Sequence, residues 1–486
     1  MKIEEYIECD GLALAKLIQN KEVKPQELLN IAIGLADQLN PAINAIVIPF
    51  YDKAFQQIKN GLPPGIFSGV PSLLKNLSTS YKDTIETNGS RYFQDNVCLT
   101  TSESVQRFLN QGMVFFGRTN SPELGLSYTT EPSFYGPTHN PWDFTRTPGG
   151  SSGGAAAAVA SRIVPIAMAS DGGGSIRIPA ACCGVFGLKP SRCRIPTGPE
   201  SAEAWASLAT QFVISRSVRD SAAALDILGK PQIGSYYPLL APPTEPYLNS
   251  HTQSPKNLKI GLLQNVFADV PIDPECQMAL EHAIKLFENL GHHVESVTVK
   301  INADPLAKAM YSIIAAHVEY ALRYQKSLKN RSYTADDLEP ITRYFAEFAR
   351  HVRSHDMIAS KNIIFQTMQP IAQLTTKYDV LLTPALAKPP VLLGEINSFD
   401  DFQHFTQKNI EFCPFTSLFN QSGQPAMTVP IYWSKQGLPL SVQCAAAVGN
   451  ELVLLQLAAQ IEEAQPWSTK KPDFLNQLLV SKKLKN

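Results

Sequence analysis

The segment that decides the fold, Thr147–Pro190, reads TPGGSSGGAAAAVASRIVPIAMASDGGGSIRIPAACCGVFGLKP. It contains two glycine-rich turns, Gly149–Gly154 and Gly172–Gly174, and each of them borders a serine. The residues between the turns predict a short helix of small residues followed by an apolar strand. Because a helix and a strand that pack as neighbours run in opposite directions, we expect both turns at one edge of a sheet, with Ser151 close to Ser175.

Outside this segment, hydrophobic periodicity predicts further helices and strands in alternation. The predicted helices cover residues 24–39, 101–111, 154–161, 276–290 (with Met278 on its apolar face) and 451–461, and the predicted strands cover 42–50, 69–75, 113–117, 163–169, 259–263, 293–299, 427–433 and 440–445. This alternation favours an α/β protein with a central, mostly buried sheet. The proline-rich stretch 229–255 is the best candidate for a linker or a long surface loop. Of these two readings we favour one large domain, 1–486.

Composition excludes several classes of function. The 486 residues include 42 Lys+Arg and 43 Asp+Glu, and this balance gives no reason to expect a nucleic-acid or membrane partner. Residues 1–10 are acidic and polar, unlike a signal peptide, and no apolar tract is long enough to span a bilayer. The eight cysteines form no C-x-x-C pair, so we expect no metal site or other cofactor, reduced thiols and a cytoplasmic location.

The glycines before Ser175 indicate acyl-transfer chemistry. Three successive residues without Cβ allow several backbone N–H groups to converge on one point, as an oxyanion requires. A serine nucleophile also needs a base, and the segment contains no histidine. Lys75 ends the apolar run Gly69–Lys75, and burial can lower a lysine pKa from ~10.4 to about 7–8. A neutral Lys75 could therefore serve as that base.

Each feature alone has an ordinary structural interpretation. Glycine-serine turns are mostly loops, or anion-binding turns at helix N-termini, and a lone lysine usually lies on the surface. Arg177 is more readily explained as the ion-pair partner of Asp171 than as a substrate ligand. Cys183 is disfavoured as a second nucleophile. The segment lacks both G-x-x-x-x-G-K-[ST] and G-x-G-x-x-G, which argues against nucleotide binding.

In combination, the motifs resemble the amidase-signature family. The resemblance rests on GVPSLLK at 69–75, the GGSSGG turn, D-x-G-G-S-I-R-x-P from Asp171, and GLKP. It continues through ISRSVRD at 214–220, FNQSGQPAMTVP at 419–430 and GLPLSVQ at 437–443, and thus covers most of the chain. The wording ASDGGGSIRIPA is most similar to the subgroup that contains 6-aminohexanoate cyclic-dimer hydrolases.

The resemblance implies a fold and a set of catalytic roles. The fold is a single large α/β/α sandwich with a mixed central sheet covered by helices on both faces, its signature core at about 65–230 and the rest of the sheet at about 256–470. Ser175 falls on the nucleophile, Lys75 on the catalytic lysine, and Ser151 on the bridging serine that follows a cis peptide bond. The remaining implied positions are the oxyanion-hole backbone at Gly172, Gly173, Gly174 and Ser175, and the loop supports Ser152, Asp171 and Arg177.

The implied activity is hydrolysis of a small carboxylic amide through a Ser175 acyl-enzyme, with no cofactor and with a homodimer as the expected assembly. Two departures from the family pattern stand out: Asn76 replaces an aspartate, and Gly172 replaces threonine or isoleucine. The alternatives are a glutaminase subunit of a tRNA-dependent amidotransferase and a catalytically silent binding homologue. Aromatic residues could line an acyl pocket, although helical packing suits the first two better: Tyr311, Tyr320, Phe412, Phe415 and Phe419.

Overall fold

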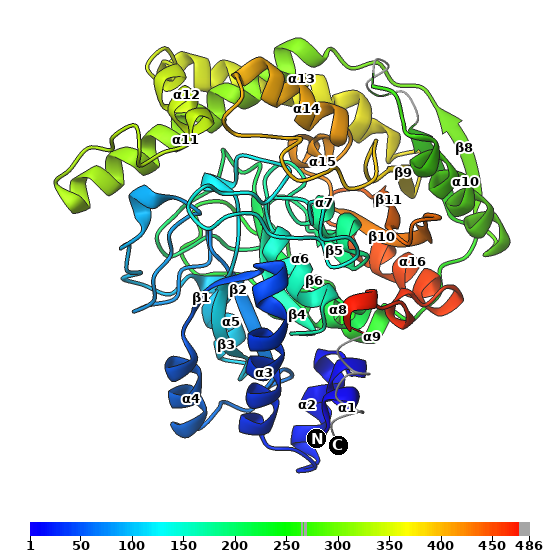
Figure 1. The fold of residues 1–486 in the computed structure, drawn as a ribbon. Coiled ribbons are helices and arrows are strands. Elements are labelled where there is room, and N and C mark those ends of the chain that lie inside the picture. Colours follow the sequence, from blue (N-terminus) through cyan, green and yellow to red (C-terminus); the bar gives the residue numbers. More distant parts are fainter. Residues whose placement is uncertain (264–265, 267–269, 476–486) are drawn as a thin grey trace.

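The computed structural model describes residues 1–263, 266 and 270–475, and its strands form two sheets surrounded by helices (Figure 1). The strands are β1 (Ile46–Pro49), β2 (Pro71–Lys75), β3 (Val114–Thr119), β4 (Ile166–Asp171), β5 (Phe186–Lys189), β6 (Thr210–Ser215), β7 (Lys259–Leu263), β8 (His293–Val297), β9 (Val380–Pro384), β10 (Ala426–Trp433) and β11 (Pro439–Ala445). The larger sheet has eight strands in the order β4-β6-β5-β10-β11-β9-β7-β8, and the smaller one has the order β1-β3-β2. β7 pairs in parallel with β8 and β9, while the other pairs of the larger sheet are antiparallel. The expected mixed α/β architecture is confirmed.

Helices cover the larger sheet. They are α1 (Ile3–Glu8), α2 (Gly11–Gln19), α3 (Pro25–Ile43), α4 (Tyr51–Lys59), α5 (Glu103–Leu109), α6 (Gly153–Ala160), α7 (Arg177–Cys183), α8 (Val218–Leu228), α9 (Tyr247–Ser250), α10 (Pro274–Asn289), α11 (Ala303–Lys329), α12 (Pro340–Ala349), α13 (Ser354–Leu374), α14 (Phe402–Phe412), α15 (Ser417–Ser422) and α16 (Glu451–Ala464), with 3₁₀ turns η1 (Arg91–Phe93), η2 (Glu123–Gly125) and η3 (Trp467–Thr469). Strands β10 and β11 contact α7 as well as α10, and Figure 1 places these two helices on opposite sides of the strands. Within the described residues, no helix combines the length and apolar character needed to cross a bilayer.

The two sheets meet along their edge strands, β2 and β4. These strands are in contact, and the Ser72 hydroxyl of β2 donates to the Ile166 carbonyl of β4 at 2.9 Å. Lys75 is the last residue of β2, and Ser170 and Asp171 end β4. The junction of the sheets therefore brings a lysine from one sheet to the serine-rich end of the other.

Two sequence predictions for local structure are wrong at their boundaries. The strand expected over 42–50 is shorter, because α3 continues to Ile43 and ends at Asn44, which has a left-handed backbone (φ +49°). Pro179 does not stop the helix after Ser175, since α7 runs through it. Pro179 is the third residue of α7, where a backbone N–H has no intrahelical acceptor, so the missing N–H costs no hydrogen bond.

Two other expectations concern surface segments. Met278 of α10 was expected on the apolar face of its helix, but its side chain is 39% exposed. The neighbouring positions Ala279 and Ala283 are buried instead. The proline-rich stretch 229–255 contains one short helix, α9, and connects α8 to β7.

Two helical glycines give a matched test of this packing. A Cβ at Gly154 in α6 would lie 2.5 Å from the Asn120 backbone nitrogen and 2.6 Å from the Ala45 carbonyl oxygen, and backbone atoms cannot move aside cheaply. A Cβ at Gly34 in α3 would meet nothing within 4 Å. We expect Gly154→Ala to lower the melting temperature measured by circular dichroism. Gly34→Ala should raise stability by about 0.5–1 kcal/mol, because alanine favours the helix. Equal melting temperatures for the two variants would contradict this packing.

Candidate active site

Lys75 is fully buried at the end of β2 and contacts two serines. Its Nζ donates to Ser151 Oγ at 2.7 Å and to Ser170 Oγ at 3.0 Å. Burial disfavours the ammonium form and lowers the pKa of Lys75 to about 7, although the negative charge of Asp171 acts in the opposite direction. Near neutral pH a substantial fraction of Lys75 is therefore unprotonated and able to accept a proton.

Asn76 explains one departure from the family pattern. Its buried amide donates to Thr87 Oγ1 at 2.7 Å and accepts from the Thr87 N–H at 2.9 Å. An aspartate could not donate to the threonine oxygen, and its negative charge next to Lys75 would favour the ammonium. The asparagine thus meets both hydrogen bonds and leaves Lys75 easier to deprotonate.

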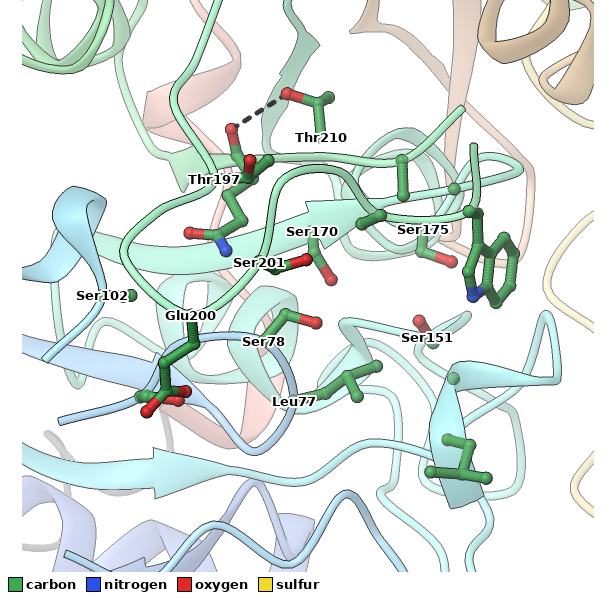
Figure 2. A pocket seen from close by; sticks show the side chains of 18 of the residues that line it. Leu77, Ser78, Ser102, Ser151, Ser170, Ser175, Thr197, Glu200, Ser201 and Thr210 are labelled. Carbon is green, nitrogen blue, oxygen red and sulfur yellow. Dashed lines mark hydrogen bonds between the residues drawn. The ribbon is translucent and has the colours of Figure 1, made fainter. Parts of the chain in front are cut away.

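The two glycine-rich turns lie together, as expected. Ser151 and Ser152 precede α6, Ser175 precedes α7, and the Ser152 N–H donates to the Ser175 carbonyl at 3.2 Å. The Gly150–Ser151 peptide bond is cis, in agreement with the resemblance. Ser151 and Ser175 line one cavity of about 220 Å³, and Figure 2 shows both hydroxyls facing the same space.

The loop between β4 and Ser175 is shaped by the Asp171 carboxylate. Its oxygens accept the N–H groups of Gly174 at 2.8 Å and of Ile176 at 3.1 Å. The Gly174 N–H, one of the expected oxyanion donors, is therefore already engaged. Among the described residues, no acceptor hydrogen-bonds the N–H groups of Gly172, Gly173 or Ser175.

Gly174 fits where no other residue would. Its φ is +134°, and a Cβ would lie 2.2 Å from Thr416 Oγ1. The Thr416 hydroxyl in turn donates to the Gly173 carbonyl at 2.7 Å. This contact faces the Gly173 carbonyl away from its own N–H and so fixes the direction of the loop.

Arg177 forms the expected ion pair with Asp171, and both side chains are fully buried. The guanidinium also donates to the Thr416 carbonyl at 2.7 Å, Gln443 Oε1 at 2.6 Å and Asn420 Oδ1 at 2.6 Å. Burial alone would raise the pKa of Asp171, but Arg177 and the Asn420 amide outweigh it and hold that pKa below its usual range. The carboxylate therefore stays charged at all working pH values.

Gly172 is explained by Trp205. A Cβ at residue 172 would lie 2.8 Å from the indole ring, which also lines the cavity of Ser175. Trp205 belongs to a turn of three successive left-handed residues, with Ala206 and Ser207 (φ +49°, +53° and +65°). The threonine or isoleucine usual at position 172 would displace this ring.

Several residues of the site had no role assigned from the sequence. Asn420 and Gln443 lie in the C-terminal motifs that carry the resemblance, so the motifs marked them without indicating their contact with Arg177. Ser170 adjoins the D-x-G-G-S motif and was overlooked. No pattern in the sequence pointed to Trp205.

The aromatic residues considered for an acyl pocket divide. Tyr311 lines a second cavity of about 120 Å³ that also reaches Ser175. Tyr320 is 69% exposed on α11, away from this cavity. Core packing accounts for the other three, which are buried and line neither cavity: Phe412, Phe415 and Phe419.

Other chemistry finds little support at this site. Burial raises the pKa of the Cys183 thiol well above its ordinary value, so this thiol is a poor nucleophile. In the part of the chain that the structure describes, no three His, Cys, Asp or Glu side chains gather in a way that could hold a metal ion.

Comparison with known proteins agrees with this geometry. The model of the Amidase family matches residues 27–455. The 6-aminohexanoate-cyclic-dimer hydrolase of Paenarthrobacter ureafaciens is 35% identical over 481 residues, which cover 96% of this chain and 97% of that protein. The solved structure of a 6-aminohexanoate cyclic dimer hydrolase with substrate superposes with a TM-score of 0.89 at 33% identity, over 96% of this chain and 99% of that one.

A bacterial aryl acylamidase of the amidase-signature family superposes with a TM-score of 0.85 at 28% identity, over 95% of this chain and 97% of that one. The family match, the fold and these relatives agree. This chain belongs to the amidase family and is an amidase-signature hydrolase of amide C–N bonds.

Proposed function

We propose that Ser175 is the nucleophile of this amidase, and that Ser151 and Lys75 form its proton relay. The observation that carries the proposal is the 2.7 Å contact between Lys75 Nζ and Ser151 Oγ, made by a fully buried lysine beside the cavity that Ser175 lines. A buried lysine of lowered pKa next to a hydroxyl is the arrangement that activates a serine without histidine.

In the acylation step, Ser175 Oγ attacks the carbonyl carbon of the amide. Its proton passes to Ser151 Oγ while the Ser151 proton passes to the neutral Lys75 Nζ. The carbonyl oxygen becomes an oxyanion, which we place against the free N–H groups of Gly172, Gly173 and Ser175. Gly174 contributes by its conformation, since its own N–H donates to Asp171.

Collapse of the tetrahedral intermediate breaks the C–N bond. The leaving nitrogen takes a proton from Ser151, which is reprotonated by the Lys75 ammonium, so the relay returns to its starting charge. Water then attacks the acyl-enzyme by the same route and releases the carboxylic acid. Ser152 supports the relay: its hydroxyl donates to the Ser170 carbonyl at 3.2 Å, and Ser170 Oγ accepts from Lys75.

The pair Asp171–Arg177 acts in support of the loop. Its buried contacts position the glycines, and neither side chain lines the cavity of Ser175. We expect loss of either partner to disturb oxyanion binding through the loop rather than through direct contact with substrate.

Neither alternative function is favoured. The relatives that match nearly the whole chain are amidohydrolases rather than amidotransferase subunits. A catalytically silent homologue would have no need to keep the Lys75–Ser151 contact.

We also propose a cytoplasmic location, a single domain and a homodimer for this enzyme. All eight cysteines are free thiols, as is usual in a reducing compartment. The family match across residues 27–455 supports one domain. The homodimer and the absence of nucleic-acid or membrane partners stay predictions from composition and resemblance.

A fluorophosphonate probe tests the nucleophile. We expect one adduct on the wild-type protein, measured by intact mass, and none on Ser175→Ala, which should also lose turnover. Ser201→Ala is the matched control, because Ser201 lines the same cavity but its hydroxyl donates to the Glu203 carbonyl. Full activity of Ser175→Ala would refute the mechanism.

The pH profile tests the base. Lys75 must be neutral to accept a proton, and its pKa is about 7, so kcat/KM should rise with pH through about 7 and then level off. Lys75→Ala should lose at least about 100-fold and recover part of that loss only at high pH.

The control for this profile is Lys189→Met. Burial also lowers the pKa of Lys189 to about 7, but its Nζ donates to the Pro190 carbonyl instead of a serine. The rise near pH 7 should persist in Lys189→Met and vanish in Lys75→Ala. The reverse outcome would assign the rise to Lys189 and contradict the proposed relay.

A further inference from the structure

Ser175 stands between two cavities of different character. One, of about 220 Å³, is lined mainly by polar residues and is called here the polar cavity. The other, of about 120 Å³, is lined mainly by aromatic and aliphatic side chains of α11, α12 and α14 and is called the aromatic cavity. Trp205 and Gly125 line both, so the indole ring is a shared wall.

The proposed proton relay distinguishes the two cavities. Ser151 and Ser170 line the polar cavity, and neither lines the aromatic one. The leaving nitrogen must lie within hydrogen-bond reach of Ser151 to receive its proton. The amine part of the substrate therefore occupies the polar cavity, which leaves the aromatic cavity for the acyl part.

The aromatic cavity offers no partner for a charged group. Its walls include Tyr128, Ile314, Phe345 and Phe405, and no Lys, Arg, His, Asp or Glu among the described residues lines it. The polar atoms of Asn409 are already used, since Oδ1 accepts the Tyr128 N–H and Nδ2 donates to the Phe405 carbonyl. A charged acyl group would lose its hydration without compensation. The volume suits a group near the size of benzene.

The polar cavity contains an unsatisfied hydroxyl. Ser102 Oγ is buried and has no hydrogen-bond partner among the described residues, and the side chain is 8% exposed. A buried hydroxyl of this kind calls for a partner, here a ligand or water. Glu200 is the one acidic residue lining this cavity, and no Lys or Arg of the described chain lines it. Figure 2 shows Ser102 and Glu200 at the end of the cavity away from Ser175.

We infer that the substrate is an N-substituted amide with an apolar acyl group, of benzoyl or short alkyl size, and an amine part that carries a hydrogen-bonding group. The acyl group fills the aromatic cavity, and the polar group of the amine reaches Ser102 and Glu200. This inference rests on the proposed relay of Lys75 and Ser151. An anionic group on either side of the amide is disfavoured, which argues against a glutamine substrate.

A pair of substrates with exchanged halves tests the assignment. N-(2-hydroxyethyl)benzamide has the apolar group on the acyl side, and N-benzyl-2-hydroxyacetamide has it on the amine side. We expect kcat/KM, measured by chromatography of the released amine, to favour the first by at least about 10-fold. N-(2-hydroxyethyl)succinamate, with a charged acyl part, should be the poorest of the three. A preference for the benzyl compound or for the succinamate would overturn the inference.

Variants locate the acyl group. Ile314→Trp fills the aromatic cavity and should lower kcat/KM for the benzamide at least about 10-fold relative to N-(2-hydroxyethyl)acetamide. Ile410→Trp, at the exposed rim of the same cavity, gives a second reading that does not depend on core packing. Ile358→Trp is the control, because Ile358 is 65% exposed on α13 and lines neither cavity. An unchanged ratio in both cavity variants would contradict the acyl assignment.

Ser102→Ala locates the amine group. It should raise KM for the hydroxyethyl amides and leave the KM of N-ethylbenzamide, which lacks the hydroxyl, unchanged. Equal effects on both would contradict a contact with the amine part. Fluorophosphonate labelling of Ser175 separates the two levels: if Ser175 labels but no amide of the set is cleaved, the substrate class is wrong, and if Ser175 does not label, the relay itself falls.

Discussion

The buried pair of Asp171 and Arg177 is the interaction on which the site depends. Two opposite charges without water are costly unless every hydrogen-bonding position is filled, and removal of one partner would strand the other. Here the carboxylate holds the N–H groups of the glycine loop, and the guanidinium reaches Asn420 and Gln443 on α15 and β11. Elements more than 200 residues apart in the chain are thereby fixed around the short loop that presents Ser175. The same contacts hold the pKa of Asp171 low, so this framework does not titrate while the enzyme works.

The relay depends on a second constraint, the junction of the two sheets. Lys75 belongs to β2 of the small sheet and Ser170 to β4 of the large one, so their contact exists only where the two edges meet. The burial that this junction imposes is also what lowers the pKa of Lys75 to about 7. Position and basicity therefore have one cause. A lysine at the same place in an open groove would remain an ammonium and could not accept the proton of Ser151.

The sequence predicted those parts that depend on local pattern. Periodicity located most helices and strands, and the motifs indicated Lys75, Ser151 and Ser175 before their proximity was known. The failures are tertiary. Pro179 was read as a helix stop, although its position in the first turn of α7 makes it harmless. Asn420 and Gln443 lay in motifs whose partner, Arg177, is more than 240 residues away. Trp205 lies outside every motif, because its contact with Gly172 depends on how a distant turn folds over the sheet.

That contact between Gly172 and Trp205 bears on the history of the chain. A side chain at 172 and the indole ring at 205 exclude each other, since both would occupy the same space. The order of substitution is therefore constrained. A lineage that carried threonine or isoleucine at 172 had to lose it before tryptophan at 205 could be accommodated, and a return is blocked while the ring remains. The two positions constitute an epistatic pair, and substrate preference in this branch evolves through them together or not at all.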